Sequence, residues 1–224
     1  MDITGIEFLG IDRVIKRGTA KIIREDEKAV FVFDTVSGAY MLACDDTGYG
    51  VTLLDGFIDD SCRLLMTADL KTGKIAYKKY GFSEKLECYQ VGYYGNMPEI
   101  NTNITVRTAN ESDLPLLIRT YDLISPEEME TVVKRRSLLL GYVDGDLIGF
   151  IGEHLEGSMG LLYVFPQFRR NGYAEALEKI FIKKTMEKGF IPFGQVEKDN
   201  TASLLLQKKL GMTQSSNLIC WMWR

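Results

Sequence analysis

The sequence of 224 residues is poor in the side chains that build metal centres and disulfide frameworks. It contains one histidine, His154, and four scattered cysteines that form no Cys-x-x-Cys pair. Protein zinc sites are usually built from clustered cysteines and histidines, so we expect no metal site. We interpret the cysteines as buried free thiols, because disulfides are rare in a reducing compartment.

The sequence also lacks long apolar runs and any excess of positive charge. No apolar run approaches the ~20 residues that cross a bilayer, and the segment after Met1 has no basic region followed by an apolar one. The net charge is −4, which gives no reason to expect nucleic acid or a membrane surface as a partner. We therefore expect a cytoplasmic protein, with either one large domain or two of about 100 residues.

One stretch joins a predicted strand to a predicted helix through a turn suited to an anion. Leu161 to Phe165 is an apolar run rich in aromatic and β-branched residues, which predicts a buried strand that stops at Pro166. In the turn that follows, Gly172 and Ala174 keep side chains away from the first helical turn. The N–H groups of that first helical turn have no partner inside the helix and lie at the positive end of the helix dipole. They can therefore bind an anion such as a pyrophosphate.

This spacing is neither the six-residue glycine fingerprint of dinucleotide-binding proteins nor a P-loop ending in Gly-Lys-Ser/Thr. It resembles motif A of the GNAT acetyltransferase superfamily, which reads Arg/Gln-x-x-Gly-x-Gly/Ala after a strand and a proline. Arg169, Gly172 and Ala174 fill this pattern, with Pro166 before them. The alternative is an ordinary strand-to-helix turn with glycine as a joint, and the flanking segments decide against it.

The predicted elements from residue 104 onward follow the order of a complete GNAT domain, β-α-α-β-β-β-α-β-α-β. Ser125 and Glu128 are placed as the two ends of a capping box, and Asn200 is placed as the cap of the last helix. Residues 195–200 and Gly211 resemble motif B of the superfamily. The predicted strands are 104–107, 138–143, 147–152, 158–165, 191–196 and 218–223, and the predicted helices begin at 110, 125, 172 and 200.

Residues 1 to about 100 are predicted to form a smaller α+β unit. It is expected to contain a hairpin of strands 29–33 and 39–44, a turn at 45–48, a strand at 61–65, a helix at 74–80 and a strand at 87–93. The end of that helix, residues 77–82, aligns with residues 207–212. Convergence on good helix capping explains part of this match, and the alternative is a decayed GNAT repeat without a cofactor motif.

The predicted fold class is therefore α+β, with the GNAT fold of a mixed, mostly antiparallel central sheet flanked by helices, in two tandem GNAT-like halves. We predict an N-terminal domain at 1–100 and a catalytic domain at 104–224, joined by the turn-rich segment 95–103. Within the superfamily, the closest resemblance is to the glycine N-acyltransferase-like branch, whose members carry a degenerate first half and end in a strand containing Trp, as Cys220 to Trp223 does.

The resemblance implies transfer of an acyl group, usually acetyl, from acetyl-CoA as co-substrate to an amine in a ternary complex. The turn at 169–174 would hold the pyrophosphate, and the backbone of 162–164 would pair with the pantetheine amides. The thioester would lie near Asn200. The cofactor-binding residues implied in this way are Leu162, Tyr163, Val164, Arg169, Arg170, Asn171, Gly172, Tyr173, Ala174, Asn200 and Gln207.

A general base or a water relay must take the proton of the attacking amine. In the glycine N-acyltransferase-like branch a glutamate begins the motif A strand, whereas Ser158 stands at that position here. The candidates left open are Glu153, His154, Glu156 and Ser158. The tyrosine by which many relatives protonate the departing thiolate is also missing, because Gln207 takes its place.

The alternative to an N-acetyltransferase for a small molecule or an amino acid is a non-catalytic acyl-CoA-binding or interaction protein, which the two missing residues favour. A third option makes homodimerisation the main task of the first half. The acceptor and the acyl chain length stay open, because loops and strand ends shape such pockets.

Overall fold

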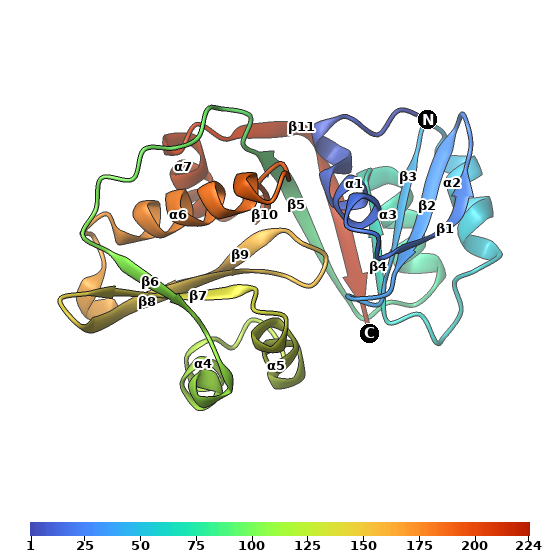
Figure 1. Cartoon of the computed structure of the whole chain (residues 1–224). Helices are drawn as coiled ribbons and strands as arrows, with labels where there is room; N and C mark the ends of the chain where they lie inside the picture. The colour runs from blue at the N-terminus through green and yellow to red at the C-terminus, as the bar shows by residue number, and fades with distance from the viewer. The chain divides into compact units, whose positions relative to one another are not determined.

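The computed structural model describes residues 1–224, which form two compact units (Figure 1). The first unit contains residues 1–92 and 193–224, and the second contains residues 93–192. These units do not coincide with the predicted domains, 1–100 and 104–224, because the last strand of the chain pairs with strands from its first half. The origin of the chain from two related halves stays a prediction.

The sheet of the first unit has the strand order β1-β2-β3-β4-β11-β5-β10. Neighbouring strands are antiparallel, except that β3 and β4 are parallel. The predicted hairpin of 29–33 and 39–44 is confirmed as β2 and β3. The strands are β1 (Ala20–Glu25), β2 (Ala29–Asp34), β3 (Ala39–Cys44), β4 (Leu64–Thr67), β5 (Glu84–Gly92), β10 (Phe193–Glu197) and β11 (Thr213–Trp223).

Helices cover both faces of this sheet, so its central strands are buried on both sides. Ile11 of α1 packs against Val30 and Val32 of β2 on one face, whereas Leu54 of α2 packs with Phe31 on the other. This burial explains why β2 is an uninterrupted apolar run rather than an alternating one. The helices are η1 (Ile6–Phe8), α1 (Leu9–Lys16), α2 (Thr47–Asp55), α3 (Leu70–Lys79) and α7 (Thr201–Lys209).

Helix α2 begins where the sequence predicts only a turn, at residues 45–48. Asp46 caps it by accepting a hydrogen bond from the backbone N–H of Tyr49 at 2.7 Å. Two glycines lower its helix propensity, but Gly50 allows the helix to lie against β3. A Cβ atom there would lie 2.5 Å from Cys44 Sγ. Tertiary packing therefore decides the structure of this segment.

A chain of amide side chains links the end of the protein to its beginning. Trp221 Nε1 donates to Gln195 Oε1 at 2.7 Å, and Gln195 Nε2 donates to Gln90 Oε1 at 3.2 Å. Gln90 Nε2 then donates to the carbonyl of Ile6 at 2.8 Å. Because a buried polar group left unsatisfied is costly, this chain fixes the positions of β11, β10, β5 and η1 relative to one another.

The second unit has an antiparallel sheet in the order β9-β8-β7-β6. The predicted strands 138–143 and 147–152 are confirmed as β7 and β8, which pair as a hairpin. Asp144 and Gly145 take left-handed conformations at its turn, with φ of 51° and 90°. Such a turn matches the twist of the strands it joins. The strands are β6 (Thr105–Thr108), β7 (Leu138–Val143), β8 (Asp146–Glu153) and β9 (Met159–Val164).

Helices again cover both faces of this sheet (Figure 1). Leu117 of α4 and Met129 of α5 pack with Phe150 on one face, whereas Leu177 of α6 packs with Ile148 on the other. None of the helices combines the length and the apolar character that a membrane span requires. The helices are η2 (Glu111–Asp113), α4 (Leu114–Thr120), α5 (Pro126–Lys134), η3 (Pro166–Phe168) and α6 (Tyr173–Glu187).

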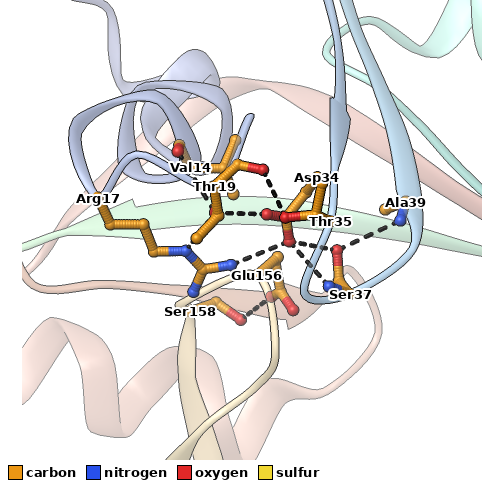
Figure 2. Close-up of polar contacts among 9 residues, drawn as sticks. All are labelled: Val14, Arg17, Thr19, Asp34, Thr35, Ser37, Ala39, Glu156 and Ser158. Carbon is orange, nitrogen blue, oxygen red and sulfur yellow. Dashed lines mark hydrogen bonds and ion pairs between the residues drawn. The ribbon is translucent and has the colours of Figure 1, made fainter. Parts of the chain in front are cut away.

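A buried carboxylate anchors the turn between β2 and β3 in the first unit (Figure 2). Asp34 has no exposed surface and accepts hydrogen bonds from Thr19 Oγ1 at 2.5 Å, Ser37 Oγ at 2.6 Å and Arg17 Nη2 at 2.9 Å. Burial by itself raises the pKa of Asp34, but the hydrogen bonds from Ser37 and Thr19 and the charge of Arg17 outweigh burial and lower it. The ionised form of Asp34 therefore stabilises the fold.

We predict that Asp34→Asn lowers the free energy of unfolding by about 2 to 3 kcal/mol at pH 7, because it removes the charge that Arg17 and the hydroxyls surround. Urea unfolding followed by circular dichroism measures this loss. Since the pKa of Asp34 is lowered by folding, its contribution is present above its ordinary pKa and fades as the pH falls toward the folded value. The difference between the two proteins should therefore shrink in acid.

Asp12→Asn is the matched control, because it makes the same substitution at the surface i,i+4 pair between half-buried Asp12 and exposed Lys16. Surface pairs of this kind contribute about 0.5 kcal/mol or less. Equal losses in the two variants would contradict the role assigned to Asp34.

Candidate functional site

Strand β9 contains a bulge at the centre of the candidate site. Between the pairs Phe150–Tyr163 and Gly152–Gly160, two residues of β9 lie opposite one residue of β8. One of them, Leu161, has φ of 49° although it is not a glycine, and its side chain is buried. Such a conformation costs about 1 to 2 kcal/mol. The bulge interrupts the ladder and frees backbone groups near the middle of the strand.

After β9 the chain passes through η3 into the turn that resembles motif A. Arg169 turns back toward the strand, because its Nε donates to the carbonyl of Val164 at 2.9 Å and its guanidinium lies 5.6 Å from the ring centre of Tyr163. Asn171 Nδ2 donates to the carbonyl of Phe168 at 3.2 Å. These contacts fix the turn from within, so the predicted residues 169–171 shape the loop in addition to any contact with a ligand.

The first turn of α6 follows directly and has no side-chain cap. Arg170 and Gly172 both take left-handed conformations, with φ of 64° and 79°, and Gly172 is the residue that precedes the helix. The backbone N–H groups of Tyr173 and Ala174 therefore lie at the positive end of the helix, in positions that have no acceptor inside it. This geometry is suited to an anion.

A cleft of about 370 Å³ opens beside this helix end. It is lined by residues 99–103 on one side and by Asn171, Gly172, Tyr173 and the next two turns of α6 on the other. Lys179 in its wall pairs with Glu175 at 2.9 Å. The segment 99–103, which the sequence suggests only as a linker, thus forms one wall of a cleft at the predicted anion site.

The four candidate bases lie at the other end of β9 and are not all on one face of the sheet. Glu153 ends β8 opposite Met159, which belongs to the core under α6. Its Oε2 atom lies 3.9 Å from Nζ of Lys188, which directly follows α6. Glu153 is therefore on the α6 face.

His154 lies on the opposite face, where α5 packs. Its Nδ1 atom is 3.7 Å from Oε1 of Glu128, which was expected to close a capping box and contacts the histidine instead. A Cβ atom on Gly160 would lie 2.6 Å from His154 Nε2, so the ring rests on the bare backbone of β9. Burial lowers the pKa of His154, but the polar contact with Glu128 and the charges of Glu156 and Glu128 outweigh burial and raise it above its ordinary value.

Glu156 and Ser158 form a buried pair in the turn between β8 and β9 (Figure 2). Ser158 Oγ donates a hydrogen bond to Glu156 Oε1, and the two residues are 1% and 7% exposed. The turn is closed by His154 N–H, which donates to the carbonyl of Ser158 at 2.9 Å. Strand β9 begins only at Met159, so Glu156 lies in the turn and not on the strand. Its carboxylate is the one that contacts the Ser158 hydroxyl, and its role as a base stays a prediction.

The two remaining predicted cofactor residues belong to the first unit. Asn200 caps α7 as predicted, since its Oδ1 accepts a hydrogen bond from the backbone N–H of Ser203 at 3.1 Å. Gln207 is buried, at 8% exposed. The roles of both in binding a cofactor stay predictions.

The chain was compared with known families, proteins and structures. A family model described as FR47-like protein matches residues 139–222, and no curated protein matches. A Drosophila protein of solved structure has a TM-score of 0.67 at 12% identity, over 99% of this chain and 91% of that one. A GNAT-family putative acetyltransferase from Novosphingobium aromaticivorans has a TM-score of 0.57 at 15% identity, over 93% and 91%. A GCN5-related N-acetyltransferase-like protein from Streptococcus suis has a TM-score of 0.58 at 12% identity, over 95% of this chain and 93% of that one.

The chain has the GNAT fold. The predicted α+β class with a mixed, mostly antiparallel sheet is thereby confirmed, and so is the resemblance to the GNAT superfamily at the level of the fold. These GNAT structures match this chain over more than nine tenths of its length, so the likeness extends beyond the motif A region into both units. The nearer resemblance to the glycine N-acyltransferase-like branch stays a prediction.

Sequence reasoning missed three features of this site. Leu161 is an apolar residue in an apolar run, although it forms the bulge. Glu128 was assigned to a cap, and Gly160 was not singled out. The glycine carries the clearest missed signal, because an isolated glycine in a strand pattern often marks a close approach of another group.

No group of three or more His, Cys, Asp or Glu side chains is placed to hold a metal ion. The cysteines are free, and burial raises the pKa of Cys44 and of Cys220 to about 11. Because the thiolate is the reactive form of cysteine, these two thiols are poor nucleophiles at neutral pH.

We predict that Gly172→Ala lowers the free energy of unfolding by about 1 kcal/mol, measured by urea unfolding. The cost comes from the left-handed backbone alone, because a Cβ atom at this position meets nothing within 4 Å.

Gly56→Ala is the control, since Gly56 ends α2 with φ of −80° and its added Cβ would make only an ordinary contact. That variant should be neutral or more stable by about 0.5 kcal/mol. A loss in Gly56→Ala as large as in Gly172→Ala would show that φ is not the cause.

Proposed function

We propose that this protein is an N-acetyltransferase that transfers an acetyl group from acetyl-CoA to the amine of a small molecule or an amino acid. The observation that carries the proposal is the uncapped N-terminus of α6, preceded by Gly172 in a left-handed conformation and lying beside a cleft of about 370 Å³. The GNAT fold supports it, since this turn fills the motif A position.

The phosphate groups of coenzyme A are proposed to bind at this helix end. The amides of Tyr173 and Ala174 would donate to the pyrophosphate, with the dipole of the 15-residue helix behind them. Arg170 and Asn171 would add donors from the loop. Arg169 would act partly by holding the loop against β9, as its hydrogen bond to Val164 indicates.

The pantetheine arm is proposed to run along β9. Its amides would pair with the backbone of Leu162, Tyr163 and Val164, as an added strand does. The bulge at Leu161 would end this pairing and leave space for the thioester, because a bulge disrupts the regular ladder. Asn200 and Gln207 are retained as predicted contacts of the same co-substrate.

Transfer requires a neutral amine, so a group near the start of β9 must accept a proton. Glu156 with Ser158 and His154 are the groups that share this end of the strand, whereas Glu153 faces α6. No dedicated acid is assigned to the departing thiolate, because Gln207 has no proton to give as an acid. Coenzyme A is a good leaving group without one.

A non-catalytic acyl-CoA-binding protein is the second candidate. The observation that favours it is the pair of replaced residues, Ser158 at the usual glutamate and Gln207 at the usual tyrosine. Both candidates require coenzyme A binding, so binding alone does not separate them. A cytoplasmic location, the absence of nucleic-acid and membrane partners, and a homodimer are predictions that accompany both.

We predict that Ala174→Glu weakens coenzyme A binding at least 10-fold in isothermal titration calorimetry at low salt. The new carboxylate would stand beside the pyrophosphate and repel it, yet a carboxylate in the first turn favours the helix itself. Loss of affinity is therefore expected without loss of fold.

Lys184→Gln is the matched control, because it removes one positive charge at an exposed position near the other end of α6. It should bind coenzyme A as the wild-type protein does. No measurable affinity in the wild-type protein, or equal affinity in Ala174→Glu, would overturn the proposed phosphate site.

A free-thiol assay with acetyl-CoA and a panel of amines tests transfer itself. Thiol release with at least one amine, together with an acetylated product of the expected mass, would support the enzyme. Intact binding of acetyl-CoA without release for any amine would favour the non-catalytic candidate.

A further inference from the structure

The one histidine of the chain is held between a carboxylate and a strand that has no side chain at the point of contact. Oε1 of Glu128 lies 3.7 Å from Nδ1 on one side of His154. On the other side, the edge of the ring that carries Nε2 lies against Gly160, where a Cβ atom would come within 2.6 Å of that nitrogen. The orientation of the ring is therefore set from both sides.

This orientation places Nε2 beside the bulge of β9. Gly160 directly precedes the bulge at Leu161, so Nε2 lies at β9 next to the point where the regular ladder is interrupted. A carboxylate at Nδ1 favours the tautomer with the proton on Nδ1, which leaves the lone pair of the neutral ring on Nε2. Nε2 is then the atom that accepts a proton.

The backbone around His154 is also restrained. Its N–H donates to the carbonyl of Ser158 at 2.9 Å, and its carbonyl accepts from the N–H of Gly157 at 2.9 Å. Gly157 has φ of 101°, a value that few other residues adopt. The His154 side chain remains 30% exposed and that of Glu128 32%, so solvent and small solutes reach the pair.

Within the second unit, the charges that act on the ring come from two elements. Glu128 approaches from α5, and Glu156 lies in the same turn as the histidine. Tyr121, at the end of α4, is a third titratable group near Glu128, and burial together with the charges of Glu128 and Asp122 raises its pKa to about 12. Tyr121 is therefore neutral at pH 7, and two carboxylates face the imidazole.

We propose that Glu128 is a positioning residue that orients His154 as the general base of the acetyl transfer. The inference rests on the proposed function and deepens it, because it chooses between the two groups that share the start of β9. Glu156, which is buried and bonded to Ser158, would adjust the charge around His154 without taking the proton itself.

In the proposed step, the nitrogen of the neutral amine attacks the thioester carbon, so a C–N bond forms and the C–S bond breaks. The proton lost by the nitrogen goes to Nε2 of His154. The electron pair of the C–S bond leaves with the sulfur, and the coenzyme A thiolate takes a proton from solvent. Nothing is oxidised or reduced.

A pair of Glu128 and His154 with a purely structural role would also hold α5 against the turn. The test therefore needs a measurement that a structural role alone would not change. Because the chain has a single histidine, its imidazole signal in a proton NMR titration of the intact protein needs no assignment. We expect a pKa above 6.5 for the wild-type protein and a lower one for Glu128→Gln. Glu130→Gln, which removes the same charge from an exposed i,i+4 pair on α5, should leave the titration unchanged.

The second measurement is the kinetics of acetyl transfer to an amine identified by the thiol assay. A base must be neutral to accept a proton, so kcat/KM should rise with pH through the pKa of His154. In Glu128→Gln the rise of kcat/KM with pH should occur at lower pH, by the same shift as the NMR titration. The value of kcat/KM at high pH should fall about 10-fold. His154→Gln should lose about 100-fold or more in kcat, with coenzyme A affinity unchanged.

Gly160→Ala provides a steric test that alters no charge, because the new methyl group must displace the ring. It should lower kcat as His154→Gln does, while circular dichroism confirms the fold. An unshifted imidazole pKa in Glu128→Gln, or full activity in His154→Gln, would overturn the inference. The second result would leave the proposed function standing with Glu156 as the base, whereas absence of transfer to any amine would remove both.

Discussion

The amides of the first turn of α6 have no acceptor inside the helix, and Gly172, which precedes the helix, makes no side-chain cap. Capping a helix is worth about 1 kcal/mol, which a long helix packed through Leu177, Ile180 and Phe181 can forgo. A serine or an aspartate in place of Gly172 could cap the helix itself. It would then occupy the amides at which the phosphate groups are proposed to bind.

Three residues near this end of the second unit adopt left-handed backbone conformations, namely Leu161, Arg170 and Gly172. Glycine does so at little cost, whereas the other two each store about 1 to 2 kcal/mol. Arg136 and Asp144 of the same unit also have positive φ, so such strain is not confined to this region. The cores on both faces of the sheet hold β9 and the loop after it in place. The same positions are those at which the proposed co-substrate would meet the backbone.

The sequence is sufficient for features that depend on neighbouring residues. Both hairpins, the motif A turn and the caps at Ser125 and Asn200 follow from local patterns. It is insufficient for features that depend on contacts between residues far apart in the chain. Helix α2 forms because Gly50 packs on Cys44, and Glu128 leaves its cap because α5 lies beside the turn that carries His154. The bulge at Leu161 is equally hidden, since left-handed conformations are signalled by glycine and not by leucine.

Strand β11 lies between β4 and β5, although residues 93–212 separate it from β5 in the sequence. Without β11 those two strands lack the neighbour that joins them, and each has an open edge able to pair with other chains. Closing the first unit across so long a separation is entropically slow, so we expect these edges to be the aggregation-prone part of a partly folded chain.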